Sequence, residues 1–172
     1  MTELNVAQAP WRAGVIQDFA RSELFDRTFE EGMTLVEETA AYLDGAGRHD
    51  SKALSRSGAL AYAASSMRLT TRLMQMASWL LVQRAVREGD MAPADACQDR
   101  YRITYPQGPA EPHEGAAELP PCLVALTERA DRIYERVVHL DHRMYLEPGQ
   151  DEKVHPILRQ MERIQAAFSG AA

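Results

Sequence analysis

The sequence predicts an all-α protein, an antiparallel three-helix bundle with a long loop between its second and third helices and flexible termini. Three stretches carry apolar residues at helical steps of three and four. Glycine, proline or a capping residue bounds each stretch. The 172 residues suffice for one domain with a real core. We expect a flexible N-terminal arm over 1–21, the bundle over 22–147, and a flexible tail with a short amphipathic helix over 148–172.

The first predicted helix runs from about Glu23 to Asp44. Ser22 is a favourable N-cap residue in front of it. Gly32 lies on its inward stripe and would let another helix approach closely. The helix is expected to end at Gly45 and Gly47. Its inward stripe consists of Phe25, Phe29, Gly32, Val36, Thr39 and Leu43.

The second predicted helix, from Ser51 to Gly89, carries more apolar surface than one packing face can use. One stripe steps by four and three residues and consists of Tyr62, Ser66, Leu69, Leu73, Met76 and Leu80. Around it, other residues point elsewhere: Met74, Ala77, Trp79, Leu81 and Val82. A helix that is apolar over much of its circumference is buried on more than one side. We therefore predict that Met76, Trp79 and Val82 bind a partner or a second copy; the alternative is that they pack in the internal core and against the tail helix.

The third predicted helix has the most regular pattern. Its stripe alternates steps of four and three and consists of Leu119, Leu123, Leu126, Ala130, Ile133, Val137, Leu140 and Met144. Pro120 and Pro121 fall in its first turn, where a missing N–H does no harm, and Pro148 and Gly149 end it. The proline-containing residues 90–118 before it are predicted to form the long loop.

Both ends of the chain carry apolar residues that no long helix accommodates. The N-terminal arm contains Trp11, Ile16 and Phe19 without a clear period. The tail has a short amphipathic pattern that is too short to form a stable helix alone. We expect it to fold on binding a partner through Ile157, Met161, Ile164 and Phe168.

Composition limits the class of partner and the cell compartment. The formal net charge of −6 argues against nucleic acid, because phosphate binding needs a concentrated basic surface. Residues 1–20 lack the basic start and apolar run of a signal peptide, and no window is apolar enough to cross a membrane. The two cysteines, Cys97 and Cys122, show no disulfide-scaffold or metal spacing. These features favour a cytoplasmic protein.

The sequence contains no pattern that predicts catalysis, a cofactor or a metal. Glu135, His139 and His142 share one side of the third helix, but its register places them on the outer face, away from the bundle core where a metal site would lie. No nucleophile motif and no glycine-rich phosphate loop is present. Arg68 and Arg72 are expected to pair with acids such as Glu37 and Glu38, or to contact an acidic partner. We therefore expect a non-enzyme that works through contacts with other proteins.

Extended stretches of the chain resemble the regulator of CtrA degradation family, an alphaproteobacterial family once catalogued only as a domain of unknown function. The resemblance spans about residues 22–145 and is carried by the runs SELFDRTFEEGMTLVEETAAYLDG, MRLTTRLMQMASWLLVQRAVREGD and LTERADRIYERVVHLDHRMY. It rests on extended similarity and assigns no partner-binding residue.

The resemblance implies a dimeric helical bundle that serves as an adaptor for the ClpXP protease. Such a protein helps to deliver cell-cycle regulators for degradation and gathers at a cell pole. The alternative is a structural or scaffolding helical dimer without a protease role. The final residues Ala171 and Ala172 resemble the C-terminal tags that ClpXP engages, so they are a candidate degradation signal of the chain itself.

Overall fold

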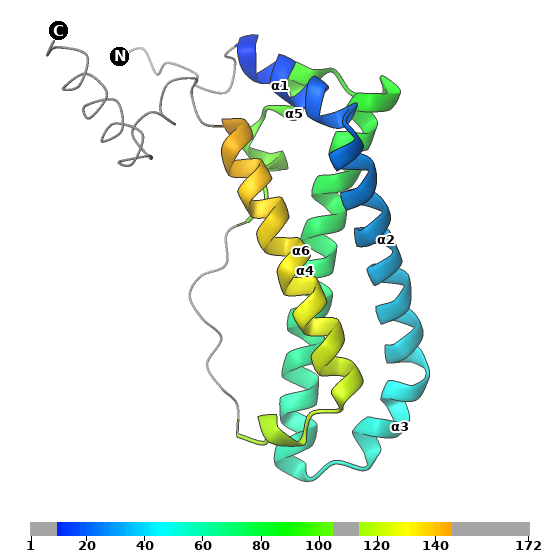
Figure 1. The fold of residues 1–172 in the computed structure, drawn as a ribbon. Coiled ribbons are helices and arrows are strands. Elements are labelled where there is room, and N and C mark those ends of the chain that lie inside the picture. Colours follow the sequence, from blue (N-terminus) through cyan, green and yellow to red (C-terminus); the bar gives the residue numbers. More distant parts are fainter. Residues whose placement is uncertain (1–9, 105–113, 146–172) are drawn as a thin grey trace, which may run out of the picture.

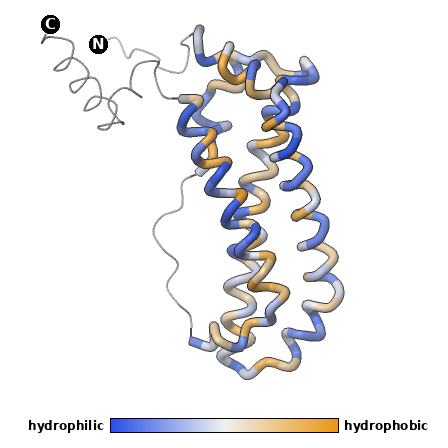
Figure 2. Tube along the Cα trace, viewed as in Figure 1, coloured by the Kyte–Doolittle hydropathy of each residue, from blue (hydrophilic) through white to orange (hydrophobic). Residues whose placement is uncertain are grey.

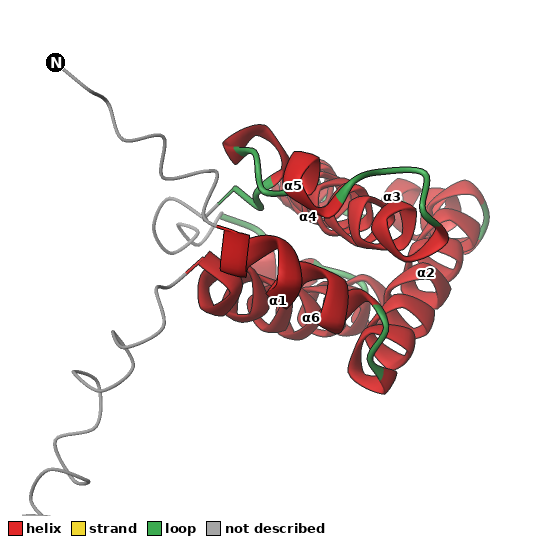
Figure 3. Ribbon diagram, turned by 90° about the horizontal axis from the view of Figure 1, so that it is seen from above, coloured by secondary structure: helices red, strands yellow, loops and turns green. Residues whose placement is uncertain are grey.

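The computed structural model describes residues 10–104 and 114–145, and the regular elements within these residues are all helical. Three long helices, α2 (Glu23–Asp44), α4 (Arg56–Glu88) and α6 (Pro121–Tyr145), lie side by side (Figure 1). Each of the three contacts the other two, and Figure 3 shows them from above. The predicted all-α class is confirmed, and the predicted bounds of the first long helix agree with those of α2.

The directions of the long helices differ from the predicted antiparallel arrangement. α2 is antiparallel to both neighbours, but α4 and α6 run parallel to each other (Figure 1). Ser55 at the start of α4 bonds Glu118 just before α6, and Trp79 late in α4 bonds Asp141 late in α6. The corresponding sequence separations are 63 and 62 residues. The connection between α4 and α6 is long enough to return along the bundle, which allows the two helices to run parallel. The apolar period of a helix does not encode the direction in which the helix runs.

The connection between α4 and α6 contributes short elements at both ends of the bundle. Near the end of α4 lie α5 (Pro93–Ala96) and the 3-10 turn η2 (Asp99–Tyr101). A second 3-10 turn, η3 (Ala116–Glu118), lies near the start of α4, where Glu118 contacts Ser55. The described part of the predicted long loop therefore packs on the bundle at both ends.

The N-terminal segment expected to be a flexible arm contains a packed helix over its described residues. This helix, α1 (Pro10–Ala20), crosses the end of the bundle and contacts α4, α5 and α6 (Figure 1). Its Ile16 and Ala20 are fully buried. The Phe19 ring lies 5.7 Å from the Trp79 ring, measured between centroids. Residues 10–20 are therefore part of the folded domain, because they supply the cover for this end of the core.

The second long helix begins later than predicted because a short helix precedes it. This helix, α3 (Ala46–Lys52), includes Gly47, which was expected to help end the helix before it. A Cβ atom at Gly47 would lie 2.5 Å from the hydroxyl oxygen of Tyr62. α4 starts after its N-cap Ser55, whose side chain accepts a hydrogen bond from the Gly58 amide at 3.1 Å.

The hydrophobic core draws residues from all three long helices, and hydrophobic and hydrophilic residues alternate along these helices (Figure 2). Gly32 of α2 faces Leu80 of α4, and a Cβ atom at Gly32 would lie 2.9 Å from a Leu80 methyl carbon. The predicted close approach at Gly32 is thus confirmed. On α6, the predicted stripe is buried at Leu123, Leu126, Ala130, Ile133, Val137 and Met144, and partly buried at Leu140. Its first residue, Leu119, lies just before α6 and is also partly buried.

Arginine–carboxylate pairs join the three long helices at the rim of the core. Arg68 and Arg72 pair with Asp131 of α6, and not with the expected Glu37 and Glu38 of α2. Further pairs link α2 to its neighbours: Arg136 with Glu31, Arg129 with Glu38, and Arg87 with Asp26. In the three pairs that link α2 to its neighbours, the side chains are 40–51% exposed, so we expect each of these pairs to contribute at most about 1 kcal/mol.

The first prediction tests the register of α6. Ile133 is 1% exposed, whereas His139 on the same helix is exposed. Ile133→Asp buries an unpaired charge and should lower the free energy of unfolding by roughly 3–5 kcal/mol. The matched control His139→Asp should change it by less than about 0.5 kcal/mol. Urea denaturation of both variants measures the difference, and equal effects would contradict the register.

Candidate interaction surface

α4 carries two regular apolar stripes on opposite sides of the helix. The inner stripe is the predicted one, and its Leu69, Leu73, Met76 and Leu80 are buried against α2 and α6. The second stripe faces away from the bundle, and we call it the outer stripe. It steps by four and three residues throughout and consists of Leu60, Ala64, Met67, Thr71, Met74, Ser78, Leu81 and Ala85.

The large residues of the outer stripe are exposed although they are apolar. The exposed fractions of Leu60, Met67, Met74 and Leu81 are 67%, 72%, 66% and 51%. These four residues repeat every seven positions, which keeps them on one side of a helix that packs in a coiled-coil manner. At 1.5 Å per residue, the line from the first to the last is about 32 Å long. Monomeric proteins rarely expose an apolar strip of this length, so the outer stripe is a candidate interaction surface.

The outer stripe is also free of charge. Between Ser57 and Gln83 the only charged residues of α4 are Arg68 and Arg72. Both arginines pair with Asp131 of α6, and therefore lie toward the side of α4 that faces the bundle. Charged residues are depleted at the centre of protein interfaces, and the uncharged outer stripe shares that composition.

A hollow of about 290 Å³ adjoins the outer stripe on its C-terminal half. Met74 and Ser78 belong both to the stripe and to the wall of the hollow. The other walls come from neighbouring turns of α4 and from the chain segment after η2, namely Gln75, Trp79, Val82, Arg100, Tyr101, Arg102, Ile103 and Thr104. Within residues 10–104 and 114–145, arginines are thus the only charged residues that line it.

One buried carboxylate holds this hollow together. Asp141 of α6 is fully buried and accepts a hydrogen bond from the Trp79 indole N–H at 2.9 Å. Its other oxygen accepts hydrogen bonds from Nε and Nη2 of Arg102, each at 3.3 Å. Burial raises the pKa of Asp141, and hydrogen bonds from Trp79, Arg102 and the Ile103 amide act in the opposite direction. The carboxylate therefore fixes α4, α6 and residues 102–103 relative to one another.

The structure separates the residues predicted to bind partners. Met76 and Trp79 are 0% and 2% exposed, so the chain's own core encloses them. The expectation that they form a contact surface is corrected, because Met76 lies against Gly32 of α2, and Trp79 contacts Phe19 of α1 and Asp141 of α6. Val82 is partly buried and lines the hollow. The predicted tail residues Ile157, Met161, Ile164 and Phe168, and the final Ala171 and Ala172, lie outside the described residues.

Sequence reasoning found only part of the outer stripe. Met74 and Leu81 were expected to point away from the inner stripe, and both are exposed. Leu60 and Met67 were missed. The signal that could have found them is the repeat of seven that links them to Met74 and Leu81.

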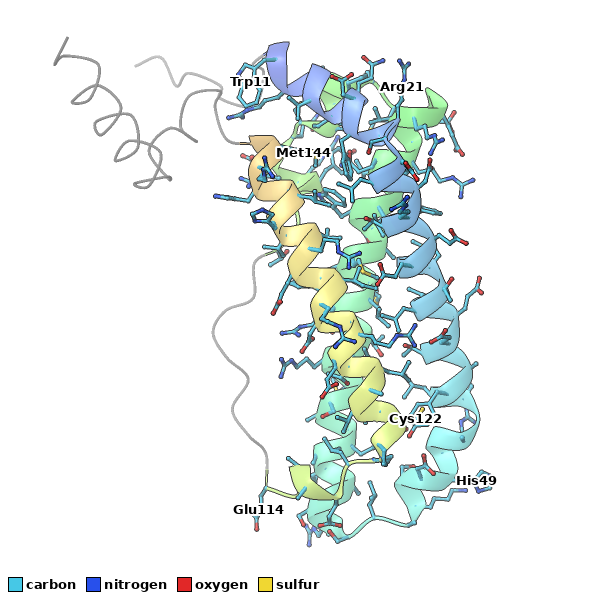
Figure 4. The ribbon with its side chains drawn as sticks, viewed as in Figure 1. Trp11, Arg21, His49, Glu114, Cys122 and Met144 are labelled. Carbon is cyan, nitrogen blue, oxygen red and sulfur yellow. The ribbon has the colours of Figure 1, made fainter. Side chains whose placement is uncertain are left out.

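The described residues show few groups suited to chemistry. Within the described ranges, no cluster of His, Cys, Asp and Glu could hold a metal ion, and no helix is long and apolar enough to span a membrane. His139 and His142 are exposed on α6, as the register predicted. Burial raises the pKa of the Cys97 thiol, which disfavours the reactive thiolate. Cys122 is exposed at the start of α6, at the opposite end of that helix from Met144 (Figure 4).

Comparison with known proteins identifies the family of this helical bundle. The sequence matches the family described as "Protein of unknown function (DUF1465)" over residues 16–168, and the chain belongs to this family. A crystal structure of RcdA from Caulobacter crescentus CB15 is 66% identical in sequence and superposes with a TM-score of 0.63. The match covers 77% of this chain and 99% of the RcdA chain. No curated protein matches the chain. The resemblance to the regulator of CtrA degradation family is thereby confirmed.

The second prediction tests the role of Asp141. Asp141→Ala leaves the indole N–H of Trp79 and the Arg102 guanidinium without this buried partner. We expect the free energy of unfolding to fall by roughly 3–5 kcal/mol. Amide hydrogen exchange of residues 99–104 should also accelerate, because their anchor is lost.

The matched control is Asp26→Ala, which breaks the exposed pair with Arg87. This variant should lose no more than about 1 kcal/mol and leave exchange in residues 99–104 unchanged. Similar losses in both variants would show that Asp141 is only an ordinary ion-pair partner.

Proposed function

We propose that the chain is a non-enzymatic adaptor that helps to deliver cell-cycle regulatory proteins to the ClpXP protease. Its similarity to RcdA, named for the regulation of CtrA degradation, supports a role in regulated proteolysis. The observation that carries the adaptor mechanism is the outer stripe, an uncharged apolar strip for protein contact. An adaptor raises the effective concentration of cargo at a second machine, which requires contact surfaces and no reaction chemistry.

The two central large residues of the outer stripe are methionines. Met67 and Met74 are 72% and 66% exposed. Methionine side chains are flexible and polarisable, and they adapt to partners of different shape. A surface that packs against a second copy can use this property to fill the spaces between side chains. We also propose that the tail contacts cargo. The protein is proposed to act in the cytoplasm, at a cell pole.

The outer stripe is also the proposed homodimer interface. Large and small residues alternate along it: Leu60, Ala64, Met67, Thr71, Met74, Ser78, Leu81 and Ala85. In a parallel pair in register, each large side chain would meet the same side chain of the other copy. Each small side chain would likewise meet a small one, which leaves gaps. An antiparallel pair can place every large side chain against a small one, so that the layers interdigitate.

The antiparallel register follows from this rule. Met67 of one copy faces Ser78 of the other, and Ala64 faces Leu81. The same register brings Leu60 to Ala85 and Thr71 to Met74, so all eight positions are paired large to small. The two-fold axis passes between Arg72 and Leu73 in sequence. Because the interface is the same patch on both copies, it closes as a dimer and does not extend into a fibre.

The third prediction tests the dimer and its direction. Met67→Asp should convert the dimer to a monomer in analytical ultracentrifugation at micromolar concentration. Two charges enter the interface per dimer, so we expect the dissociation constant to rise by at least about a hundredfold. The matched control Leu24→Asp replaces an exposed apolar residue on α2 and should leave the dimer unchanged. A wild-type monomer under the same conditions would overturn the dimer proposal.

Cysteine cross-linking distinguishes the two directions, in a Cys122→Ser background. A mixture of Ala64→Cys and Leu81→Cys chains should form a mixed disulfide in the antiparallel dimer. Ala64→Cys alone should not cross-link, because its two copies lie about 25 Å apart along the axis. Cross-linking of Ala64→Cys with itself would instead show a parallel dimer.

The fourth prediction tests delivery. In a purified reaction, the chain should accelerate degradation of CtrA by ClpXP when the other factors of the pathway are supplied. Truncation after Gly149 should weaken this acceleration but leave the melting transition nearly unchanged. If CtrA degradation never responds to the chain while the dimer forms, the alternative of a scaffolding dimer without a direct protease role gains support.

Ala171→Asp combined with Ala172→Asp should lengthen the lifetime of the chain itself under ClpXP.

A further inference from the structure

The hollow beside the outer stripe has the properties of a preformed binding site. Its floor contains Trp79 and Ile103, both buried, and its open side is bordered by Met74, which is exposed. An engineered protein cavity of about 150 Å³ accommodates benzene. A hollow of about 290 Å³ therefore has room for one large aromatic side chain or two aliphatic ones.

The walls of the hollow are fixed before any partner arrives. Asp141 bonds both Trp79 on the floor and Arg102 on the wall. The Tyr134 hydroxyl donates a hydrogen bond to the Thr104 carbonyl oxygen, which holds the end of the segment onto α6. Because these groups are already ordered, little conformational entropy is lost when a side chain enters.

The charge at the rim is of one sign. Arg100 and Arg102 line the hollow, and no acidic residue among those that the structure describes does so. Arg102 is balanced by Asp141, whereas Arg100 lies 4.7 Å from the Tyr101 ring centroid and pairs with no carboxylate within the described residues. The outer edge of the hollow therefore presents one cation beside an apolar floor.

We propose that this hollow binds a short acidic segment of a partner protein, which inserts one large apolar side chain and places a carboxylate at Arg100. The proposal rests on the proposed function, because it defines the chemistry of a segment that such an adaptor would hold. The hollow adjoins the outer stripe at Met74 and Ser78, so a segment bound in it lies beside the proposed dimer interface. A nucleic acid fits poorly, because one unbalanced arginine is too little charge for phosphate binding and the chain has a net charge of −6.

The fifth prediction uses three fluorescein-labelled octapeptides and the full chain. In the first peptide, Leu-Phe is flanked on both sides by two Asp residues and a terminal Gly. The second peptide has Lys in place of Asp, and the third has Ser-Ser in place of Leu-Phe. Fluorescence anisotropy should show binding of the first peptide at least about tenfold tighter than that of either control, because both the charge and the apolar anchor contribute.

Binding to the hollow should also appear at Trp79. The indole N–H resonance of Trp79 should shift on addition of the acidic peptide, whereas that of Trp11, in α1 and not part of the hollow, serves as the control. Higher salt should weaken binding, because the contact at Arg100 is exposed to solvent. A shift at Trp11 alone, or binding of the Lys peptide as tightly as the Asp peptide, would overturn the proposal.

Variants separate the hollow from the dimer interface. Arg100→Glu should weaken binding of the acidic peptide by about tenfold, since like charges then meet at the rim of the hollow. Gln75→Phe should also weaken binding of this peptide, because the larger side chain fills the hollow without adding charge. Met67→Asp, which alters the outer stripe outside the hollow, should leave peptide binding intact. Normal binding to both hollow variants would contradict the site, whereas failure of CtrA delivery with intact peptide binding would contradict only the proposed function.

Discussion

Every other described helix of this protein packs on one side of α4. α1, α2, α3, α5 and α6 all contact it, as do the turns η2 and η3. Their contacts use up the inner stripe and the flank that carries Trp79. None of these elements covers the large residues of the outer stripe, which stay exposed. The proposed interaction surface is thus a consequence of how a 33-residue helix is buried by partners that approach from one side.

The polar contacts of the fold fall into two groups with different consequences. The exposed arginine–carboxylate pairs between the long helices each contribute little to stability, but their positions agree with a single arrangement of helix directions. The contacts of Asp141 are different, because a buried carboxylate without its donors is strongly destabilising. The polar cluster at Asp141 therefore determines where the segment 99–104 lies, and with it the shape of the hollow.

Periodicity in the sequence was sufficient for the elements whose apolar residues form one stripe. The bounds of α2, the core residues of α6 and the close approach at Gly32 all followed from spacing and capping residues. The parallel direction of α4 and α6 did not, because a stripe looks the same in either direction and the connection was long enough for both.

The position of Trp79 could not be predicted from the spacing of α4 alone. Its burial depends on Phe19 of α1 and on Asp141 of α6. Neither contact leaves a mark in the local sequence around Trp79. The apolar residues of the N-terminal segment 10–20 show no clear helical period, because its helix contacts several elements. Its role as a cover over the end of the core was therefore not evident from the sequence. The outer stripe, in contrast, was visible as a second repeat of seven, but it was obscured by the stronger inner stripe.

The two proposals about α4 combine into one physical argument about affinity. In the antiparallel dimer the axis passes beside Arg72 and Leu73, and the hollow begins at Met74. The two Ser78 residues, one at the wall of each hollow, are then about 16 Å apart along the axis. A single small hollow of this kind binds weakly, because one side chain buries little area. Two hollows at a fixed short distance would let a partner with two acidic segments bind the second intramolecularly, at an effective concentration in the millimolar range. Dimerisation through the outer stripe would thus convert a weak contact into one that can hold a protein long enough to be transferred.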